Sequence, residues 1–374
     1  MKILIITGTY PMKENPTPSI FTHNQAIALQ KAGFDVAVLL FDIRSIRRRR
    51  KWGYSQYTYQ GVPVYRFAIP CGPFAHIGSV LSQWAVRACY PKVIRNFGKP
   101  DILHAHFSDA AVCASSFKRK YNMPLVMTEH SSGILSQPKG SFAIKQAQRA
   151  YETADVILAV GSVLQKRVEE LSQKKVHLVP NILPITMCYQ MQEKPQAFTF
   201  ISVGSLQQGK RFDLTLQAFA QFRRKHPKAK LLIVGKGSQK GELLQLVHKL
   251  KAEGFVRFLG SVPNEEMPQI YAKAHVFVLP SDMETFGVVY AEAIACGLPA
   301  IATDCGGPTD IITPQNGIVI PKDDEETLLQ AMELVFVNYK NYDRQQNAKD
   351  ILKKFGEKSI VKQLTEVYNA VYPS

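Results

Sequence analysis

Short apolar runs alternate with longer amphipathic segments along the chain, and this alternation occurs twice. Runs of mostly Val, Ile and Leu predict buried parallel strands, and the segments between them predict helices. The predicted strands cover residues 2–7, 36–40, 62–69, 102–105, 125–128, 156–159, 176–179, 198–203, 231–234, 256–259, 276–279 and 318–320. The predicted helices cover residues 19–32, 79–97, 109–121, 141–153, 162–170, 213–225, 239–252, 264–272, 286–296 and a last one from about residue 324.

This order of elements indicates an α/β fold. Strands that alternate with helices predict a parallel, doubly wound sheet, here one in each half of the chain. Asp213 and Asn264 stand at predicted helix starts, where their side chains would cap the helix. Residues 43–61 break the rhythm with a basic run and several tyrosines, and we predict an exposed excursion there. Two such sheets predict two domains facing a cleft that binds a ligand.

Length and punctuation agree with two domains, because 374 residues exceed one ordinary core. A polar stretch with Pro180, Pro184 and Pro195 separates the halves, and we place the boundary after residue 183. Residues 1–7 predict a first strand and not a signal peptide, and no run reaches the roughly 18 apolar residues of a spanning helix. The six cysteines lack CxxC spacing, which indicates reduced thiols and a cytoplasmic protein.

The charge of the chain is uneven. Residues 1–183 contain 24 Lys and Arg against 10 Asp and Glu, whereas residues 184–374 contain 22 against 20. The excess is sharpest at Arg47–Trp52, a run that is typical of a solvated loop. A basic face beside an aromatic residue also suits an anionic membrane surface, which attracts each basic residue by about 1 kcal/mol. We favour the membrane surface over nucleic acid, which we do not expect as a partner.

Two carboxylates mark one corner of the second half. Glu284 lies in the polar loop after the strand 276–279, and Glu292 lies on an otherwise apolar face of the following helix. A structural ion pair is one interpretation, because an ionised acid in an apolar setting costs several kcal/mol unless something binds it. Ligands of open α/β sheets bind at the carboxyl ends of strands. The corner is therefore a candidate site for hydroxyl and phosphate groups.

Glycines follow several strands of the second half. They occur at Gly204, Gly235, Gly260 and the pair Gly306–Gly307. Glycine at these places lets backbones approach closely and lets N–H groups face an anion, although turns also need glycine. The motif GxxxxGK[ST] is absent, which excludes a P-loop, and no GxGxxG follows the first strand.

Six segments together resemble the retaining glycosyltransferases of family 4, which have the GT-B fold. The segments are TYPMKENPTPSIFTHNQAIALQKAG, PDILHAHF, TEHSSG, VGSLQQGKRFD, LGSVPNEEMPQIYAKAHVFVLPS and PSDMETFGVVYAEAIACGLPAIATDCGGPTDII. The resemblance covers almost the whole chain. It implies two doubly wound Rossmann-like domains that face a central cleft. Residues 1–183 would bind the acceptor and residues 184–356 the nucleotide sugar, and a helix at about 357–374 would pack back on the first domain.

The resemblance also implies roles for matching residues. Lys210 would hold the donor diphosphate, Glu284 the sugar hydroxyls and Glu292 the ribose hydroxyls, and His130 would lie near the reacting sugar. A surface lysine and a buried structural histidine are the alternatives for Lys210 and His130. The implied catalytic residues are Glu284, His130 and Lys210. The implied donor site is Gly204, Ser205, Lys210, Arg211, Gly235, Val262, Glu284, Thr285, Phe286, Gly287 and Glu292, and the acceptor side is Ser19, His106 and His130.

Two positions depart from the family pattern. Ser205 stands where Arg is frequent, so one phosphate charge is missing unless Arg211 supplies it. Ser19 stands where Gly is frequent, which affects how closely the opening loop approaches the donor. Neither departure touches the two carboxylates.

The implied activity is transfer of a sugar, with retained configuration, from a nucleotide diphosphosugar of the UDP-sugar type. The acceptor would be a glycan or lipid-linked molecule of cell-surface polysaccharide biosynthesis, such as capsule or lipopolysaccharide, at the inner face of the membrane. No Asp-x-Asp motif occurs, so we expect neither a metal nor another cofactor. Two alternatives remain: a GT-B nucleotide-sugar epimerase, and a non-catalytic basic protein that binds membrane or glycolipid.

Overall fold

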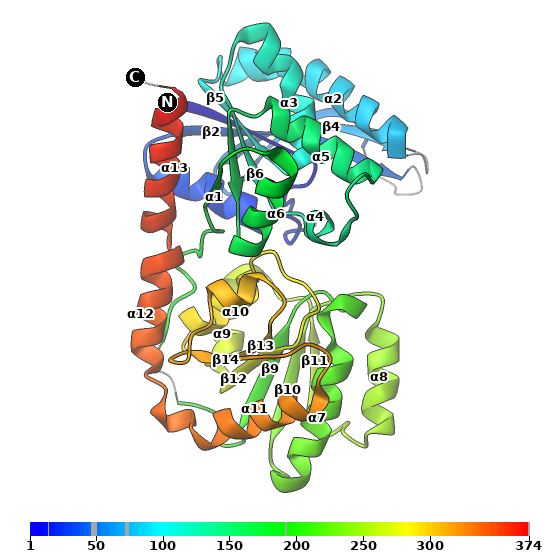
Figure 1. Cartoon of the computed structure of the whole chain (residues 1–374), viewed down its shortest axis with the longest axis vertical. Helices are drawn as coiled ribbons and strands as arrows, with labels where there is room; N and C mark the ends of the chain where they lie inside the picture. The colour runs from blue at the N-terminus through cyan, green and yellow to red at the C-terminus, as the bar shows by residue number, and fades with distance from the viewer. Residues whose placement is uncertain (14, 46–50, 72–74, 191–192, 373–374) are drawn as a thin grey trace. The chain divides into compact units, whose positions relative to one another are not determined.

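The computed structural model describes residues 1–13, 15–45, 51–71, 75–190 and 193–372. The chain divides into two compact units, each a sheet flanked by helices (Figure 1). The first unit is Met1–Ile182 with Glu357–Ser374, and the second unit is Leu183–Gly356. Within the described residues, no helix is both long enough and apolar enough to cross a membrane.

The first unit contains an eight-stranded sheet in the order β3-β4-β2-β1-β5-β6-β7-β8. All pairs are parallel except β3 with β4. Its strands are β1 (Lys2–Thr7), β2 (Asp35–Ser45), β3 (Gly53–Tyr59), β4 (Val62–Cys71), β5 (Ile102–His106), β6 (Leu125–Glu129), β7 (Val156–Ala159) and β8 (Val176–Leu178). Its helices are α1 (Ile20–Lys31), α2 (Ala75–Asn96), α3 (Ser108–Tyr121), α4 (Ser132–Ser136), α5 (Phe142–Thr153), α6 (Ser162–Ser172) and α13 (Glu357–Val371).

The second unit contains a six-stranded, fully parallel sheet in the order β11-β10-β9-β12-β13-β14. Its strands are β9 (Thr199–Val203), β10 (Lys230–Val234), β11 (Val256–Gly260), β12 (Val276–Leu279), β13 (Ala300–Thr303) and β14 (Gly317–Ile320). Its helices are α7 (Phe212–Lys225), α8 (Lys240–Lys249), α9 (Met267–Ala272), α10 (Val288–Ala295), α11 (Glu325–Val337) and α12 (Arg344–Phe355). Short 3₁₀ turns cover Gln208–Lys210, Asn264–Glu266, Gly307–Asp310 and Tyr339–Asn341.

Each sheet has a point where its strand order reverses. In the first unit, β2 lies on one side of β1 and β5 on the other. In the second unit, β10 lies on one side of β9 and β12 on the other. The loops that leave the carboxyl ends of the two strands at such a point diverge, so a ligand fits between them. Lys210 and Glu284 follow β9 and β12, and Ser19 follows β1. His106 ends β5, whereas His130 follows the next strand, β6.

The prediction of an exposed excursion at residues 43–61 is wrong for residues 43–45 and 53–59, which belong to strands of the sheet. Strand β2 continues to Ser45, and β3 pairs antiparallel with β4 through the two-residue turn Gln60–Gly61. Both turn residues have positive φ, 45° and 89°, which is the geometry that joins twisted strands tightly. The Arg47–Arg50 part of the basic run lies outside the described residues, and Lys51 and Trp52 are exposed.

Two predicted helix caps are also wrong. Helix α7 follows Arg211, whose backbone is left-handed. The Asp213 carboxylate accepts a hydrogen bond from the Arg211 guanidinium instead of capping the helix. Asn264 opens a 3₁₀ turn whose preceding residue is Pro263, and its side chain caps nothing. Asp324 does cap α11, because it accepts a hydrogen bond from the Thr327 N–H at 2.8 Å.

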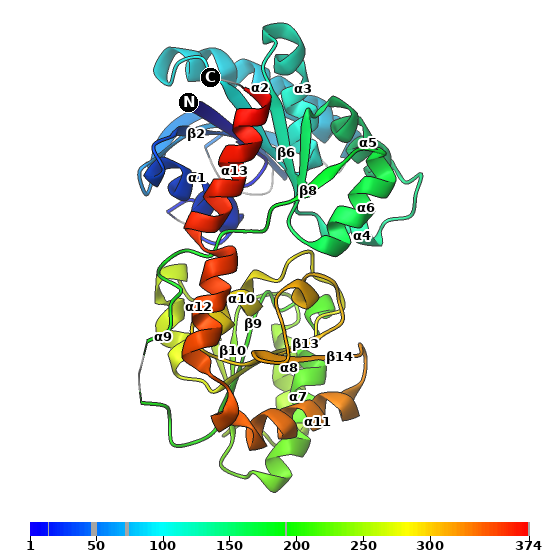
Figure 2. The same cartoon turned by 60° about the vertical axis from the view of Figure 1, so that its left-hand side comes forward.

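The C-terminal helix α13 belongs to the first unit, where it lies beside α1 in both views (Figures 1 and 2). Its buried stripe is Ile360, Leu364 and Tyr368, at the four-residue spacing of one helix face. These side chains join the apolar cluster under β1 and β2. An ion pair of 2.9 Å between Lys31 and Glu357 closes the start of the contact.

Candidate functional site

A lysine and a carboxylate meet at the strand-order reversal of the second unit. Lys210 comes from the loop after β9, and Glu284 comes from the loop after β12. The Lys210 Nζ lies 2.6 Å from the Glu284 Oε1, and the Ser281 hydroxyl donates to the same oxygen at 2.9 Å. Both side chains are partly covered, with 25% of Lys210 and 11% of Glu284 exposed. The sequence-predicted pair is therefore brought together where a ligand can still reach it.

Backbone bonds hold the two loops of this pair in place. The Asp282 N–H donates to the Gly209 carbonyl at 2.9 Å, which joins the loop after β12 to the loop after β9. The Glu284 N–H donates to the Cys305 carbonyl, and the Glu284 carbonyl accepts from the Gly307 N–H, both at 2.9 Å. Since the main chain is fixed on both sides of Glu284, its carboxylate is preorganised and does not depend on a ligand for its position.

The glycines after β9 and β10 serve close packing of the backbone. A Cβ on Gly235 would lie 1.8 Å from the Gly204 carbonyl oxygen, and φ at Gly235 is +140°. The Gly204 N–H donates to the Val234 carbonyl, and the Gly235 N–H donates to the Gly260 carbonyl. These two N–H groups therefore do not face an anion, contrary to the interpretation from sequence. Ser205 is exposed beside them, and Val262 is partly buried after β11.

Arg211 is surrounded by acids. Its guanidinium contacts the carboxylates of Asp213, Asp282 and Asp323. The hydrogen bond to Asp213, with the Asp282 carboxylate, raises the pKa of Arg211. A phosphate bound by Arg211 would therefore compete with three carboxylates, so Arg211 is a poor substitute for the arginine missing at Ser205.

Glu292 is the second carboxylate of the corner, and it is buried, with 6% exposed. The Tyr271 hydroxyl donates to its Oε2 at 3.1 Å, and no basic side chain among the described residues bonds to it. Burial raises the pKa of Glu292 to about 7, although the Tyr271 hydrogen bond opposes the shift. A carboxylate in this setting can accept hydrogen bonds from ligand hydroxyls, which would favour its ionised form.

Between the two acids, the residue that precedes helix α10 has a left-handed backbone conformation. Gly287 has φ +87° and precedes α10, so the helix begins two residues later than the predicted residue 286. Phe286 is buried against the Phe355 ring at 5.3 Å, and Thr285 is partly buried. Glu284 therefore lies just before helix α10 and Glu292 lies in its second turn. Both acids are positioned by the N-terminal end of the same helix.

In the first unit, His106 and His130 meet at the carboxyl ends of β5 and β6. The His106 Nδ1 lies 2.9 Å from the His130 Nε2, and the rings stack with centroids 5.1 Å apart. On its other face the His130 ring stacks on Phe21 at 4.5 Å. Burial lowers the pKa of His130 to about 3, so the ring is neutral near pH 7. The His130 Nδ1 is buried and has no hydrogen-bond partner among the described residues.

Ser19 occupies the position before α1 with φ +49°, in the left-handed region that glycine adopts without strain. Its hydroxyl lies 2.5 Å from the Thr9 hydroxyl, within the loop that follows β1. The serine therefore keeps the backbone conformation of a glycine at this place, and its side chain bonds inside the loop.

Sequence reasoning missed the partners that hold the predicted residues. Ser281 and Tyr271 hold the two acids, and Gln25, Thr22 and His104 surround His106. Tyr271 carries a signal that could have been used, because a buried tyrosine hydroxyl needs an acceptor. Ser281, Thr22 and Gln25 carry no such signal, since small or amide side chains occur everywhere in helices and loops.

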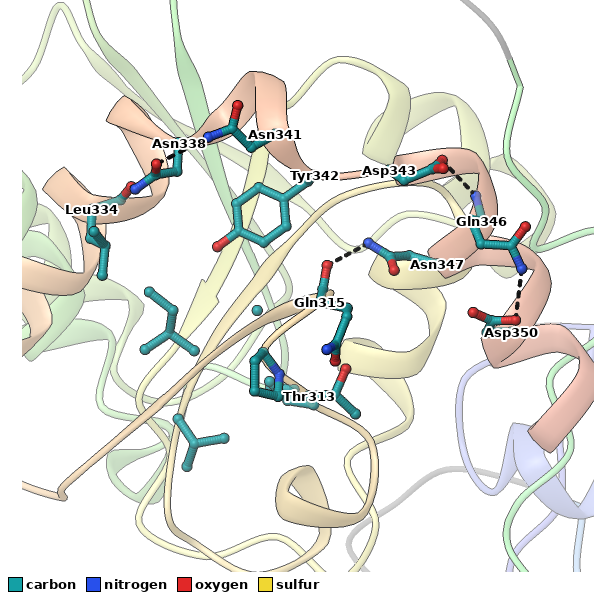
Figure 3. A pocket seen from close by; sticks show the side chains of 15 residues that line it. Thr313, Gln315, Leu334, Asn338, Asn341, Tyr342, Asp343, Gln346, Asn347 and Asp350 are labelled. Atoms are coloured by element: carbon teal, nitrogen blue, oxygen red, sulfur yellow. Dashed lines mark hydrogen bonds between the residues drawn. The ribbon is translucent and has the colours of Figure 1, made fainter.

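A pocket of about 820 Å³ in the second unit lies away from this corner (Figure 3). It lies between the start of edge strand β14, the end of α11 and the start of α12. Asn347 donates to the Gln315 carbonyl at 2.7 Å, and the Gln346 amide donates to Asp350 at 2.9 Å. No Lys or Arg is among the described residues that line it. A diphosphate would therefore find no cation there, and the pocket is not the donor site.

Comparison with known families identifies both units. The family model "Glycosyltransferase Family 4" matches residues 19–185, and the model "Glycosyl transferases group 1" matches residues 190–351. A Bacillus subtilis (strain 168) protein that carries the name of a teichuronic acid biosynthesis glycosyltransferase, TuaC, is 28% identical over 362 residues. That match covers 89% of this chain and 88% of the Bacillus protein.

Solved structures of the same architecture cover the whole chain. Sucrose-phosphate synthase (tll1590) from Thermosynechococcus elongatus aligns with a TM-score of 0.80 at 19% identity, over 100% of this chain and 99% of that one. Anabaena Alr3699/HepE in complex with UDP aligns with a TM-score of 0.75 at 18% identity, over 99% of this chain and 100% of that one. At these identities the likeness concerns the fold, which is GT-B.

Proposed function

Because the chain belongs to the family 4 glycosyltransferases, described as glycosyl transferases group 1, and is a glycosyltransferase of GT-B fold, we propose that it transfers a sugar from a nucleotide diphosphosugar with retention of configuration. The observation that carries this proposal is the Lys210–Glu284 pair at the strand-order reversal of the second unit. The pair combines a cation for a phosphate with a carboxylate for sugar hydroxyls. The acceptor is a glycan or lipid-linked molecule of cell-surface polysaccharide biosynthesis.

The donor occupies the corner between Glu284 and Glu292. Its diphosphate takes Lys210, which leaves Glu284 free to accept hydrogen bonds from the sugar hydroxyls. A lysine suits this exchange, because an ammonium is a compact charge on a flexible stem. Glu292 accepts from the ribose hydroxyls, and these bonds favour its ionised form.

The chemical step breaks the bond between the anomeric carbon and the diphosphate. Positive charge develops on the sugar while negative charge develops on the departing phosphate. Once Lys210 has moved from Glu284 to the diphosphate, its ammonium stabilises that negative charge as it develops in the transition state. The acceptor hydroxyl attacks from the same face and passes its proton to the departing phosphate, so neither a protein nucleophile nor a metal enters the proposal.

Two similarities favour particular substrates. The Anabaena HepE structure is in complex with UDP, so a UDP-sugar is the first donor to test. TuaC is named for teichuronic acid biosynthesis, and another aligned structure is the lipopolysaccharide outer core galactosyltransferase WaaB. Both names concern bacterial surface polymers, which supports a polysaccharide acceptor.

The test of this function is acceptor-dependent release of nucleotide diphosphate from a panel of UDP-sugars and other nucleotide sugars. Wild-type protein, Glu284→Ala and the exposed control Lys240→Ala are compared. We expect release in wild type and in Lys240→Ala, and a loss of at least about 100-fold in Glu284→Ala. Transfer at the wild-type rate by Glu284→Ala would refute the site. Release without an acceptor would instead favour the epimerase, and binding without release the non-catalytic alternative.

Attachment to an anionic membrane surface is part of the proposal. Helix α2 exposes Val80 (66%) and Trp84 (54%), followed on the same side by the exposed Arg87 and Arg95. Apolar and basic side chains on one stripe suit the interface of an anionic bilayer. We expect Trp84→Ser to weaken flotation with anionic liposomes, whereas Leu244→Ser, an exposed leucine of the second unit (46%), should not. Equal flotation with neutral and anionic liposomes would remove the membrane from the proposal.

A further inference from the structure

Three histidine rings form a buried ladder at the strand-order reversal of the first unit. His104 and His106 lie two residues apart on β5 and stack at 4.7 Å, and His106 stacks on His130 at 5.1 Å. His104 and His106 are fully buried, and His130 is 8% exposed. The ladder ends at the His130 Nδ1, which is buried and has no partner among the described residues.

All three rings are neutral near pH 7. Burial lowers the pKa of His104 and of His130 to about 3, and it lowers the pKa of His106 well below its ordinary value, with a contribution from the neighbouring rings. A neutral imidazole carries one N–H and one lone pair, so a bond at one nitrogen determines the proton at the other. The tautomer of one ring in the ladder therefore determines the tautomer of the next ring to which it is hydrogen-bonded.

Gln25 on α1 reaches two of the rings. Its amide nitrogen lies 3.2 Å from the His104 Nδ1 and 3.5 Å from the His106 Nε2. An amide nitrogen has two hydrogens and donates only, so both ring nitrogens accept. The Tyr368 hydroxyl, 2.7 Å from the same His104 Nδ1, is a second donor to it. The His104 proton then lies on Nε2, which is 2.7 Å from the Thr128 hydroxyl. The His106 proton lies on Nδ1 and is donated to the His130 Nε2 at 2.9 Å.

This series leaves the His130 proton on Nδ1, the atom without a protein partner. We propose that Gln25 is a positioning residue that fixes His130 as its Nδ1–H tautomer, so that His130 offers a hydrogen-bond donor to an oxygen of a ligand bound by the first unit. The part of this statement that concerns the ligand rests on the proposed function. The part that concerns the tautomer is a property of the ladder alone.

The opposite series is the alternative that an experiment must separate. If the Gln25 amide turned by 180°, its oxygen would accept from both rings and every proton would move to the other nitrogen. His130 would then show a lone pair to the ligand and accept from a sugar hydroxyl. Gln25 would choose between a donor and an acceptor at the site without touching the ligand.

The direct measurement is a long-range ¹H–¹⁵N correlation spectrum of the full chain labelled at its nine histidines. It separates protonated from bare ring nitrogens, and the signals lost in His130→Asn identify the ring. We expect a protonated Nδ1 and a bare Nε2 for His130 in wild type. In Gln25→Glu, in alkaline buffer that ionises the new carboxyl, the carboxylate accepts from His106 and the His130 pattern should invert.

Two further variants serve as a second perturbation and as a control. Gln25→Met removes the donor without adding an acceptor, so we expect both tautomers together, and it serves if Gln25→Glu does not fold. Gln30→Glu is the control, because Gln30 lies on the same helix and bonds to the Val36 carbonyl at 3.4 Å. A bare Nδ1 in wild type, or an unchanged His130 pattern in both Gln25 variants, would overturn the proposal.

Kinetics then connects the tautomer to transfer. Loss of one hydrogen bond to that ligand should lower kcat/KM of transfer roughly tenfold in Gln25→Glu, with no change in Gln30→Glu. Inversion of the tautomer supports the relay whether or not the chain transfers a sugar. Failure of the relay and failure of the proposed function are therefore distinguishable.

Discussion

Replacement of Glu292 by glutamine should stabilise the protein at high pH and weaken its hold on the nucleotide. The glutamine keeps the shape of the side chain and an oxygen for the Tyr271 hydroxyl, which lies 3.1 Å from the present carboxylate. It removes a charge that is 6% exposed and has no basic partner among the described residues. Glu292→Gln thus separates the energetic cost of the buried charge from packing.

The magnitude follows from the pKa of Glu292, which burial raises from 4.5 to about 7. The folded state holds this proton more tightly than the unfolded state, so wild type loses stability as pH rises from 4.5 through 7. The loss is about 3 kcal/mol, because one pKa unit is worth about 1.4 kcal/mol. The variant lacks this loss. We expect similar stability of both proteins at pH 4.5 and a more stable variant at pH 8.

The assay is thermal and urea unfolding of both proteins at pH 4.5, 6 and 8, with the exposed Glu265→Gln as control. A difference of about 3 kcal/mol corresponds to roughly 6–12 °C in Tm for a unit of this size. Nucleotide affinity is measured in the same buffers and should fall in Glu292→Gln only. Parallel pH profiles of wild type and Glu292→Gln would refute the reasoning, since the buried carboxyl would then not titrate where its environment places it.

Two other predictions address the loops of the corner. Lys210→Met should lower nucleotide affinity and kcat by roughly 100-fold, and also destabilise the fold by about 1 kcal/mol, because Glu284 loses its cation; unchanged nucleotide binding in calorimetry would contradict this. Gly235→Ala should destabilise by more than about 3 kcal/mol, because its Cβ would overlap the Gly204 carbonyl, whereas Gly241→Ala meets open space in helix α8 and should be neutral or stabilising by up to about 1 kcal/mol. Equal urea midpoints for the two glycine variants would contradict the close approach.

Much of the fold could be predicted because buried parallel strands are apolar on both faces. Strands β1 (Lys2–Thr7), β7 (Val156–Ala159) and β12 (Val276–Leu279) have the predicted bounds, and most others differ by one or two residues. The hairpin of β3 and β4 was missed because one strand lies at the edge of the sheet, with alternating covered and open side chains. Its tyrosines and polar residues therefore lack the continuous apolar run of a central strand.

Helix starts were less predictable, because capping depends on the backbone conformation before the helix, and the residue type alone does not determine that conformation. Arg211 takes a left-handed conformation before α7, and Ser19 does the same before α1. Asp213 follows the first of these turns, where its carboxylate finds the Arg211 guanidinium closer than the helix N–H groups. The same residue type at position 324, in extended backbone, does cap its helix.

The candidate site also has a part that could be predicted from the sequence and a part that could not. The meeting of Lys210 with Glu284, 74 residues apart, could be expected because both follow strands that end at one edge of the sheet. Partners that come from helices packed on the sheet could not be expected. The Tyr368 hydroxyl reaches the His104 Nδ1 at 2.7 Å across 264 residues, and no pattern in either segment marks the other. Sequence periodicity tells which face of an element is buried, but not what it meets.

The two acids of the corner differ in their hydrogen-bond partners. As a result, the charge of Glu292 depends on a bound ligand, whereas the charge of Glu284 does not. Glu284 has a lysine and a hydroxyl, so its charge and position exist before any ligand binds. Glu292 has a tyrosine hydroxyl alone and a pKa near pH 7, so its charge depends on what else donates to it. A ligand with two hydroxyls at Glu292 would therefore bind and ionise it together, with uptake of ligand linked to release of a proton. Proton release measured on nucleotide binding near pH 7 should be present in wild type and absent in Glu292→Gln; equal release in both proteins would place the titrating group elsewhere.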